Sequence, residues 1–264
     1  NDPDCYLVGE ARTDEATILT LYESGIDSLF NFPASDSTGR FVKAALAGKS
    51  STVSAAQADW NARIRAVSPA SVDAPFVSNH DMARARGMLR SKVPNEKAAA
   101  LLYLLMPGVP TVYYGEELGM SGSGSDENKR LPMVWSSDAA TQCKAPAAAD
   151  QAQRLTDGVA EQDSDPDSLL NWYRQLIALR NLAPELTRGE MTALDGGNDA
   201  ICAYTVTDAG STVAIISNVS QKDTLTVSLD VLRGAELLGG IGGAAFADGT
   251  ANLPPLSGII VRLP

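Results

Sequence analysis

The first two thirds of this chain alternate short apolar runs with longer helical patterns, and this alternation restricts the fold more than any other feature. Apolar runs occupy residues 5–9, 25–32, 74–79 and 109–114, and at least one helical pattern follows each of them. Strands separated by helices are typical of parallel βα units. The last of these runs is continuous and apolar, as expected of a strand buried on both faces. The sequence therefore predicts an α/β fold with four parallel strands.

The segments between the apolar runs predict helices, and two further segments do not. The final helix has apolar side chains at helical spacing and follows a group of N-cap residues. Glycine and serine dominate residues 119–128, which predicts a flexible surface loop, and residues 135–162 show no clear pattern. The predicted helices cover residues 14–23, 39–47, 57–67, 96–105 and 168–182.

The chain changes character from about residue 190. Short β-rich runs at residues 200–207, 211–219, 223–230 and 257–263 are separated by turn sequences such as DGGN, DAGS and QKD, a pattern typical of antiparallel strands. We expect two domains. Residues 1–185 form the α/β part, and residues 186–264 form a small antiparallel β-sandwich.

Charge excludes some classes of protein. The 264 residues include 21 Lys and Arg and 32 Asp and Glu, a formal net charge of −11. Nucleic-acid binding needs a basic surface, so we expect no nucleic-acid partner. The longest apolar run, residues 98–115, is interrupted by Pro107, Gly108 and Pro110 and predicts a helix and a strand rather than a membrane span. The acidic balance and the absence of an initial Met favour a secreted or periplasmic parent protein, although no signal peptide is visible.

Histidine and cysteine are scarce, which limits the chemistry. The single histidine, His80, excludes any site built from several histidines. The three cysteines, Cys5, Cys143 and Cys202, lie far apart without a C-x-x-C pair, so neither a zinc ribbon nor a disulfide scaffold is indicated. We expect them to be small buried residues, with a single disulfide left open as an alternative.

Polar side chains follow three of the four predicted strands. Glu10 follows the first, His80 and Asp81 follow the third, and Glu116 and Glu117 follow the fourth. Each has an ordinary explanation taken alone: a solvated loop residue, a structural histidine or a helix cap. Because the carboxyl ends of parallel strands meet at one edge, we expect them to lie together. Two carboxylates and one histidine suit the cleavage of a glycosidic bond.

Several segments, taken in order, resemble the α-amylase superfamily, glycoside hydrolase family 13. YLVGEA at the first strand is similar to the general-acid segment of that family, and PFVSNHD is similar to its Asn-His-Asp signature. GVPTVYYGEELGM resembles the eighth barrel strand, and SDENKRLPMVW resembles the segment after it. GIDSLFNF and DPDSLLNWYRQLIALR also match in order and spacing. The resemblance implies strands five to eight of a (β/α)8 TIM barrel, followed by the C-terminal sheet domain.

The resemblance also implies roles for individual residues. Glu10 would be the general acid and base, and Asp81 the carboxylate that stabilises the transition state. His80 would donate hydrogen bonds to sugar hydroxyls, and Arg130 would help to hold a terminal glucose. Glu117 would support the end of the barrel as a structural residue. The expected substrate is an α-glucan or malto-oligosaccharide, hydrolysed with retention of configuration.

One catalytic group of the family is missing from the sequence. Retaining hydrolysis needs a nucleophilic aspartate, which the family carries in a G-F-R-x-D-like segment, and no such segment occurs here. We expect this chain to begin just before the fifth barrel strand, to need the N-terminal half of the barrel as its partner, and to be inactive alone. No cofactor or metal ligand is assignable, although calcium is possible in the full-length parent.

Two other functions are compatible with the same residues. A transglycosylase or isomerase would use the same carboxylates on the same fold. A non-catalytic carbohydrate-binding protein or subunit of a complex would need neither carboxylate, and the presence of both Glu10 and Asp81 counts against it. The preference for linkage and chain length is left open at this point.

Overall fold

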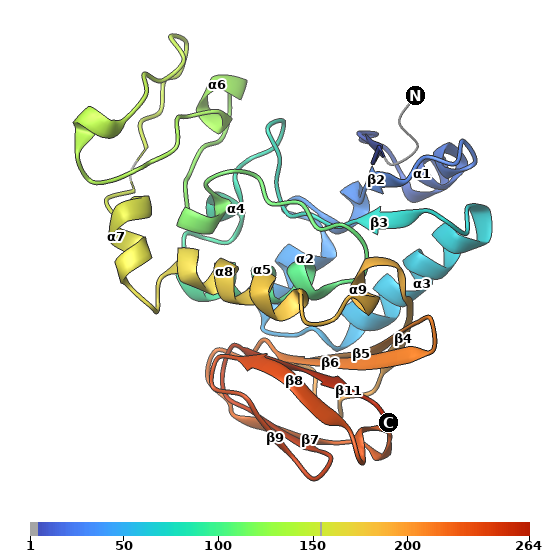
Figure 1. Ribbon diagram of the computed structural model, residues 1–264. Helices are drawn as coiled ribbons and strands as arrows, with labels where there is room; N and C mark the ends of the chain where they lie inside the picture. Colours follow the sequence, from blue (N-terminus) through green and yellow to red (C-terminus); the bar gives the residue numbers. More distant parts are fainter. Residues whose placement is uncertain (1–4, 154) are drawn as a thin grey trace.

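The computed structural model describes residues 5–153 and 155–264 and has an α/β part above antiparallel sheets (Figure 1). Three short strands form a parallel sheet in the order β1-β2-β3, and helices separate them along the chain. The elements of this part are β1 (Val8–Gly9), α1 (Glu15–Tyr22), β2 (Ser28–Phe30), α2 (Arg40–Ala47), α3 (Ser51–Val67) and β3 (Val72–Ala74).

Two of the helices after β3, α5 and α8, lie side by side in the middle of the molecule. Their apolar faces contact each other and the sheet below. Ser168 caps α8 by accepting a hydrogen bond from the Asn171 N–H, which is the role predicted for an N-cap serine. The later helices are α4 (Ala85–Met88), α5 (Val93–Leu105), α6 (Asp126–Lys129), α7 (Val159–Ser164), α8 (Leu169–Arg180) and α9 (Glu185–Arg188).

Two strand predictions differ from the structure. The predicted strand at 74–79 is instead β3, which ends at Ala74. The predicted strand at 109–114 is wrong as a regular strand, because this segment makes only two strand-like bonds beside β3. The Val109 N–H donates to the Asp73 carbonyl at 2.8 Å, and the Thr111 N–H donates to the Pro75 carbonyl at 2.9 Å. Pro110 lies between these two donors and has no N–H to offer the opposite side.

The tail is built from antiparallel strands, as predicted from residue 190 onward. A five-stranded sheet has the order β4-β5-β6-β11-β8, and a three-stranded sheet has the order β7-β10-β9. The sequence pattern missed four of these strands: β4, β8, β9 and β10. The strands are β4 (Glu190–Leu194), β5 (Ile201–Asp208), β6 (Ser211–Asn218), β7 (Leu225–Ser228), β8 (Glu236–Ile241), β9 (Ala245–Ala247), β10 (Thr250–Leu253) and β11 (Ser257–Arg262).

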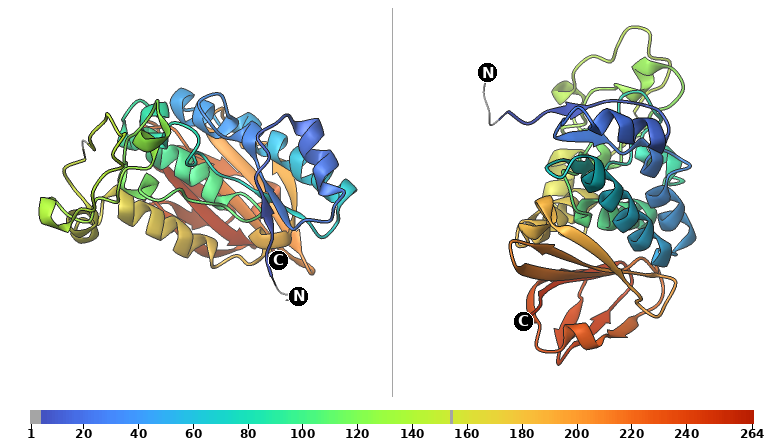
Figure 2. Two further views of the ribbon diagram at one scale, coloured as in Figure 1. Left: turned by 90° about the horizontal axis from the view of Figure 1, so that it is seen from above. Right: turned by 90° about the vertical axis from the view of Figure 1, so that its right-hand side faces the viewer.

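The five-stranded sheet has apolar contacts on both faces. One face lies under the helices, which cover the sheet when seen from above and are stacked on it when seen from the side (Figure 2, left and right). The other face shares an apolar cluster with the three-stranded sheet, including Ile216 of β6 and Val227 of β7. Tyr204 of β5 donates a hydrogen bond to the Leu105 carbonyl at 2.7 Å, and this bond ties the sheet to the end of α5.

Arg180, the last residue of α8, binds several backbone segments near the end of α5. Its guanidinium group donates to four carbonyl oxygens, which belong to Leu104, Met106, Gly108 and Leu186. Burial lowers the pKa of Arg180 to about 10, so the group remains charged at neutral pH. The end of α8 therefore fixes the end of α5 and the beginning of the tail.

The cysteine prediction is wrong for two of three residues. Only Cys202 is buried, where burial raises the pKa of its thiol to about 12, whereas Cys5 and Cys143 are exposed. All three are free thiols. Within the described ranges, no helix combines the length and the apolar character that crossing a bilayer requires.

Candidate active site

The four residues predicted for the site lie together at the carboxyl end of the parallel sheet. Glu10 follows β1 directly, and the segment after β3 carries His80 and Asp81. A side-chain ligand atom of each of these three lies within 4.8 Å of the other two. Arg130, the residue that directly follows α6, joins this group through its side chain, which binds Asp81. The strand ends thus bring Glu10, His80 and Asp81 together as predicted, whereas Glu116 is buried against Ser78 and is not part of this group.

Asn79 connects the two carboxylate residues, and the sequence reasoning did not single it out. Its side-chain Nδ2 donates to Glu10 Oε1 at 2.9 Å, and its Oδ1 accepts the Asp81 backbone N–H at 3.0 Å. Asn79 is only 9% exposed, whereas its partners Glu10 and Asp81 are exposed, so each bond has its Asn79 end buried and its other end near solvent. One carboxamide therefore sets the position of both carboxylate residues. Its place inside the Asn-His-Asp motif was the available signal.

Asp81 lies among three positively charged or polar neighbours. Arg130 Nη2 is 3.1 Å from its Oδ1, and His80 Nε2 is 3.3 Å from the same oxygen. The Lys129 ammonium group donates to the Asp81 carbonyl at 3.1 Å. The side chains of Asp81 and Arg130 are 45% and 44% exposed, so water screens the ion pair and its main effect is to orient the groups.

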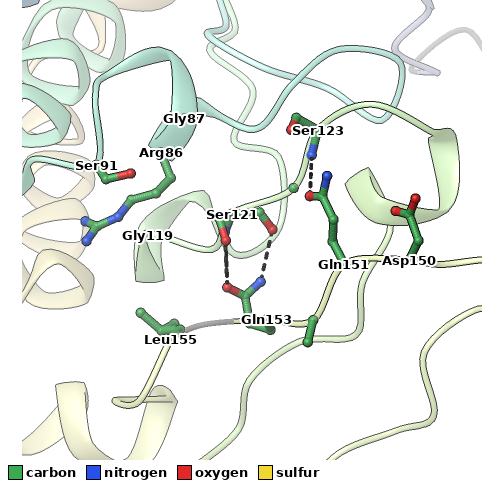
Figure 3. A pocket seen from close by; sticks show the side chains of 12 residues that line it. Arg86, Gly87, Ser91, Gly119, Ser121, Ser123, Asp150, Gln151, Gln153 and Leu155 are labelled. Atoms are coloured by element: carbon green, nitrogen blue, oxygen red, sulfur yellow. Dashed lines mark hydrogen bonds between the residues drawn. The ribbon is translucent and has the colours of Figure 1, made fainter.

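Residues 119–128, predicted as a flexible surface loop, directly precede Lys129 and Arg130 and include the first three residues of α6. Carboxamide side chains from residues 151 and 153 bind the backbone of this loop (Figure 3). Gln151 accepts the Ser123 N–H, while Gln153 accepts the Ser121 N–H and donates to the Ser121 carbonyl. A pocket of about 740 Å³ is lined by these two stretches and by Arg86, Gly87 and Ser91. These distant glutamines could not be paired with the loop from local sequence patterns.

The two glutamates after the irregular fourth run have different surroundings. Glu116 is buried and accepts hydrogen bonds from Ser78, Tyr103 and Tyr173, and burial raises its pKa to about 7. Glu117 is partly buried, and burial also raises its pKa. The sequence placed both at a strand end but gave no sign of the hydroxyl groups around Glu116.

Calcium does not suit the donor set at this site. Glu10, His80 and Asp81 form a group of possible metal ligands among the described residues. Calcium takes six to eight oxygen ligands, whereas this group offers two carboxylates and an imidazole. Arg130 already neutralises part of the charge on Asp81.

Comparison with known proteins gives consistent matches. Residues 1–189 match the family model described as alpha amylase, catalytic domain. Alpha-amylase 3 of Dictyoglomus thermophilum is 27% identical over 265 residues, covering 99% of this chain and 52% of the relative. Trehalose synthase of Thermus thermophilus is 33% identical over 133 residues, covering 46% of this chain and 14% of the relative.

A solved structure agrees in fold as well as in sequence. Eubacterium rectale Amy13B has a TM-score of 0.90 and 34% identity, covering 98% of this chain and 52% of that structure. The chain thus spans about half the length of the first relative and of this structure. These matches confirm the predicted resemblance and the α/β fold. The chain belongs to the α-amylase family, glycoside hydrolase family 13.

Proposed function

We propose that Glu10 is the general acid and base, and Asp81 the transition-state carboxylate, of a retaining hydrolase of α-glucosidic bonds. The observation that carries this proposal is the Asn79 carboxamide, which binds Glu10 and the Asp81 backbone at the same time. Two carboxylate residues from different strand ends are thereby held in fixed relation beside the only histidine. The substrates that fit the family are starch-like glucans and malto-oligosaccharides.

The reaction proceeds in two displacements. In the first, the bond from the anomeric carbon to the leaving oxygen breaks, the oxygen takes a proton from Glu10, and a nucleophilic carboxylate bonds to the anomeric carbon. In the second, water attacks that carbon and gives a proton to Glu10, and the carboxylate leaves. The negative charge of Asp81 favours the oxocarbenium-like transition state of both displacements.

His80 and Arg130 are proposed to bind the sugar. The side chain of His80 is 45% exposed and that of Arg130 is 44% exposed, so both retain surface for hydroxyl groups. Their shared contact with Asp81 Oδ1 places them around the carboxylate that would face the anomeric carbon. Neither role requires a proton transfer, because each side chain only donates hydrogen bonds.

The nucleophile is proposed to come from the preceding half of a (β/α)8 barrel, with this chain supplying strands five to eight. β1 pairs only with β2 among the described strands. Tyr6, Leu7 and Val8 beside its free edge are 43%, 56% and 42% exposed. An unpaired apolar edge of this kind is normally covered by another strand. We therefore expect that the chain alone does not hydrolyse malto-oligosaccharides.

A transglycosylase or isomerase is the second candidate function. The similarity to a protein named trehalose synthase, at 33% identity over 133 residues, is the observation that favours it. Both functions use the same first displacement and differ in whether water or a sugar hydroxyl attacks in the second. Product analysis separates them, because hydrolysis increases the number of reducing ends, whereas transfer or isomerisation does not.

The test uses a chimera that joins the part of the Dictyoglomus relative preceding the matched region to this chain. We expect the chimera to hydrolyse maltopentaose and to release the α-anomer first, whereas the 264-residue chain alone has no activity. Replacing Glu236, an exposed glutamate on β8, by Gln is the matched control and leaves turnover unchanged. Hydrolysis by the chain alone, or β-anomer release, contradicts the proposal. Binding of maltopentaose by a folded but inactive chimera would favour a non-catalytic role.

A further inference from the structure

The carboxyl group of Glu116 is a junction of three segments that are distant in sequence. Oε2 accepts a hydrogen bond from Ser78 Oγ at 2.8 Å. Oε1 accepts from the Tyr103 hydroxyl at 2.8 Å and from the Tyr173 hydroxyl at 2.9 Å. Glu116 is 5% exposed, and all three hydroxyl groups are buried. The carboxyl group therefore joins the segment after β3 to both α5 and α8.

This junction is next to the groups that hold the candidate site. Ser78 directly precedes Asn79, which binds Glu10 and the Asp81 N–H. A shift of Ser78 would carry the Asn79 carboxamide with it and change the distance between the two carboxylates. Positional errors of about 1 Å at a reacting centre reduce rates by about 10²-fold. The contact between Ser78 and Glu116 is thus well placed to control the site without touching a substrate.

A carboxyl group at this position is not explained by packing. Burial penalises its charged form and raises its pKa to about 7, and Glu117 adds repulsion. An apolar side chain of similar volume would avoid that cost but could not bind three hydroxyl groups. The arrangement is accounted for by what the carboxyl group holds in place.

We infer that Glu116 is a positioning residue, which fixes the 78–81 segment, and through it Glu10 and Asp81, against helices α5 and α8. This inference rests on the proposed function of Glu10 and Asp81. The hydrogen bond from Ser78 ties the 78–81 segment to the Glu116 carboxyl group, and the bonds from Tyr103 and Tyr173 hold that group against α5 and α8.

The first test monitors the position of the 78–81 segment by NMR and does not require catalytic activity. His80 is the only histidine, so its imidazole gives a single assignable set of NMR signals in the 264-residue chain. We expect Ser78→Ala and Glu116→Ala to shift and broaden these signals. Glu116→Gln should restore them, because its carbonyl oxygen accepts from both tyrosines and its amide donates to Ser78.

The controls are buried groups of the same kind that lie elsewhere. Glu185 is a buried carboxyl group that accepts from Ser211 at 2.6 Å, and Tyr204 is a buried tyrosine bonded to the Leu105 carbonyl. Glu185→Gln and Tyr204→Phe should lower the unfolding temperature while leaving the His80 signals in place. If Ser78→Ala leaves the His80 signals unchanged, the inference is overturned. If Glu116→Ala fails to fold, the Ser78→Ala variant still tests the inference.

The second test uses kinetics in the chimera. Ser78→Ala is expected to lower kcat about 10²-fold and to change KM by a smaller factor, because the rate depends more steeply on the relative position of Glu10 and Asp81 than sugar binding depends on the position of His80. An unchanged kcat contradicts the inference. An inactive parent chimera would instead count against the proposed function, while the His80 signals would still report on the junction.

Discussion

Asn79 Nδ2 lies 2.9 Å from Glu10 Oε1, so a side chain in the segment after β3 orients the carboxylate that follows β1. The same carboxamide accepts the Asp81 N–H, so the geometry of both carboxylates depends on one residue. In the proposed reaction, proton delivery and charge stabilisation must act on adjacent atoms of one glycosidic bond. Asn79 provides the fixed relation that this requires.

Changing Asn79 to Asp should therefore impair catalysis strongly. The new carboxylate cannot donate to Glu10 and repels it, so we expect kcat of the chimera to fall about 10²-fold or more. Asn252 on β10 is exposed, and Asn252→Asp is the matched control with the same change of charge. Equal kcat values for the two variants would show that Asn79 does not position Glu10.

The stability of the chain should depend on pH through Glu116. Its pKa is raised from 4.5 to about 7 in the folded state, so the folded state binds the proton more tightly than the unfolded state. The resulting stabilisation is present below pH 4.5 and is lost as the pH rises toward 7, by an amount on the order of 3 kcal/mol. Urea unfolding at pH 5 and pH 8 should show this loss in the wild-type chain and not in Glu116→Gln. Parallel changes in both proteins would contradict the assignment.

Two arginines of the α8 helix should differ sharply in their contribution to stability. Arg180 is partly buried and donates to the carbonyl groups of four buried residues, so Arg180→Ala leaves buried acceptors unpaired and should cost about 3–5 kcal/mol. Arg174 is 50% exposed and pairs with Asp163, so Arg174→Ala should cost less than about 1 kcal/mol. Denaturant titration of both variants measures the difference. Similar losses would mean that Arg180 does not connect α8 to the tail.

Gly108 should not tolerate a side chain. Its φ of +113° is unfavourable for other residues, and an added Cβ would lie 2.2 Å from the Asp73 carbonyl oxygen. Gly108→Ala should therefore destabilise the chain by more than about 2 kcal/mol. Gly87 in α4 has open space around its Cβ position, so Gly87→Ala is a suitable control and should be neutral or stabilising. A thermal melt that ranks the two variants equally would rule out this close approach.

The sequence predicted most helices because their apolar spacing and capping residues act locally. Ser168 at the start of α8 is an example, since its bond to the Asn171 N–H spans only three residues. The prediction of a strand at 109–114 was wrong because Pro110 removes a donor and the pairing beside β3 stops after two hydrogen bonds. The run of apolar residues gives no sign of where this pairing stops.

The candidate site was predictable in its members but not in its connections. Strand ends and the Asn-His-Asp segment led to Glu10, His80 and Asp81, which the fold brings together. The bonds that orient them come from side chains whose partners are far away in sequence. Tyr173 lies 57 positions from Glu116, and such a contact exists only once α8 packs against α5.

The central claim is that Glu10 delivers the proton to the glycosidic oxygen, and the direct measurement compares two substrates in the chimera. With maltopentaose, whose leaving oxygen needs a proton, Glu10→Gln should lower the rate of the first displacement by about 10²–10⁴-fold. With a 4-nitrophenyl maltoside, whose leaving group departs without a proton, the loss in that displacement should be much smaller. Equal losses for the two substrates, or no loss with maltopentaose, would contradict the role of Glu10 as the general acid.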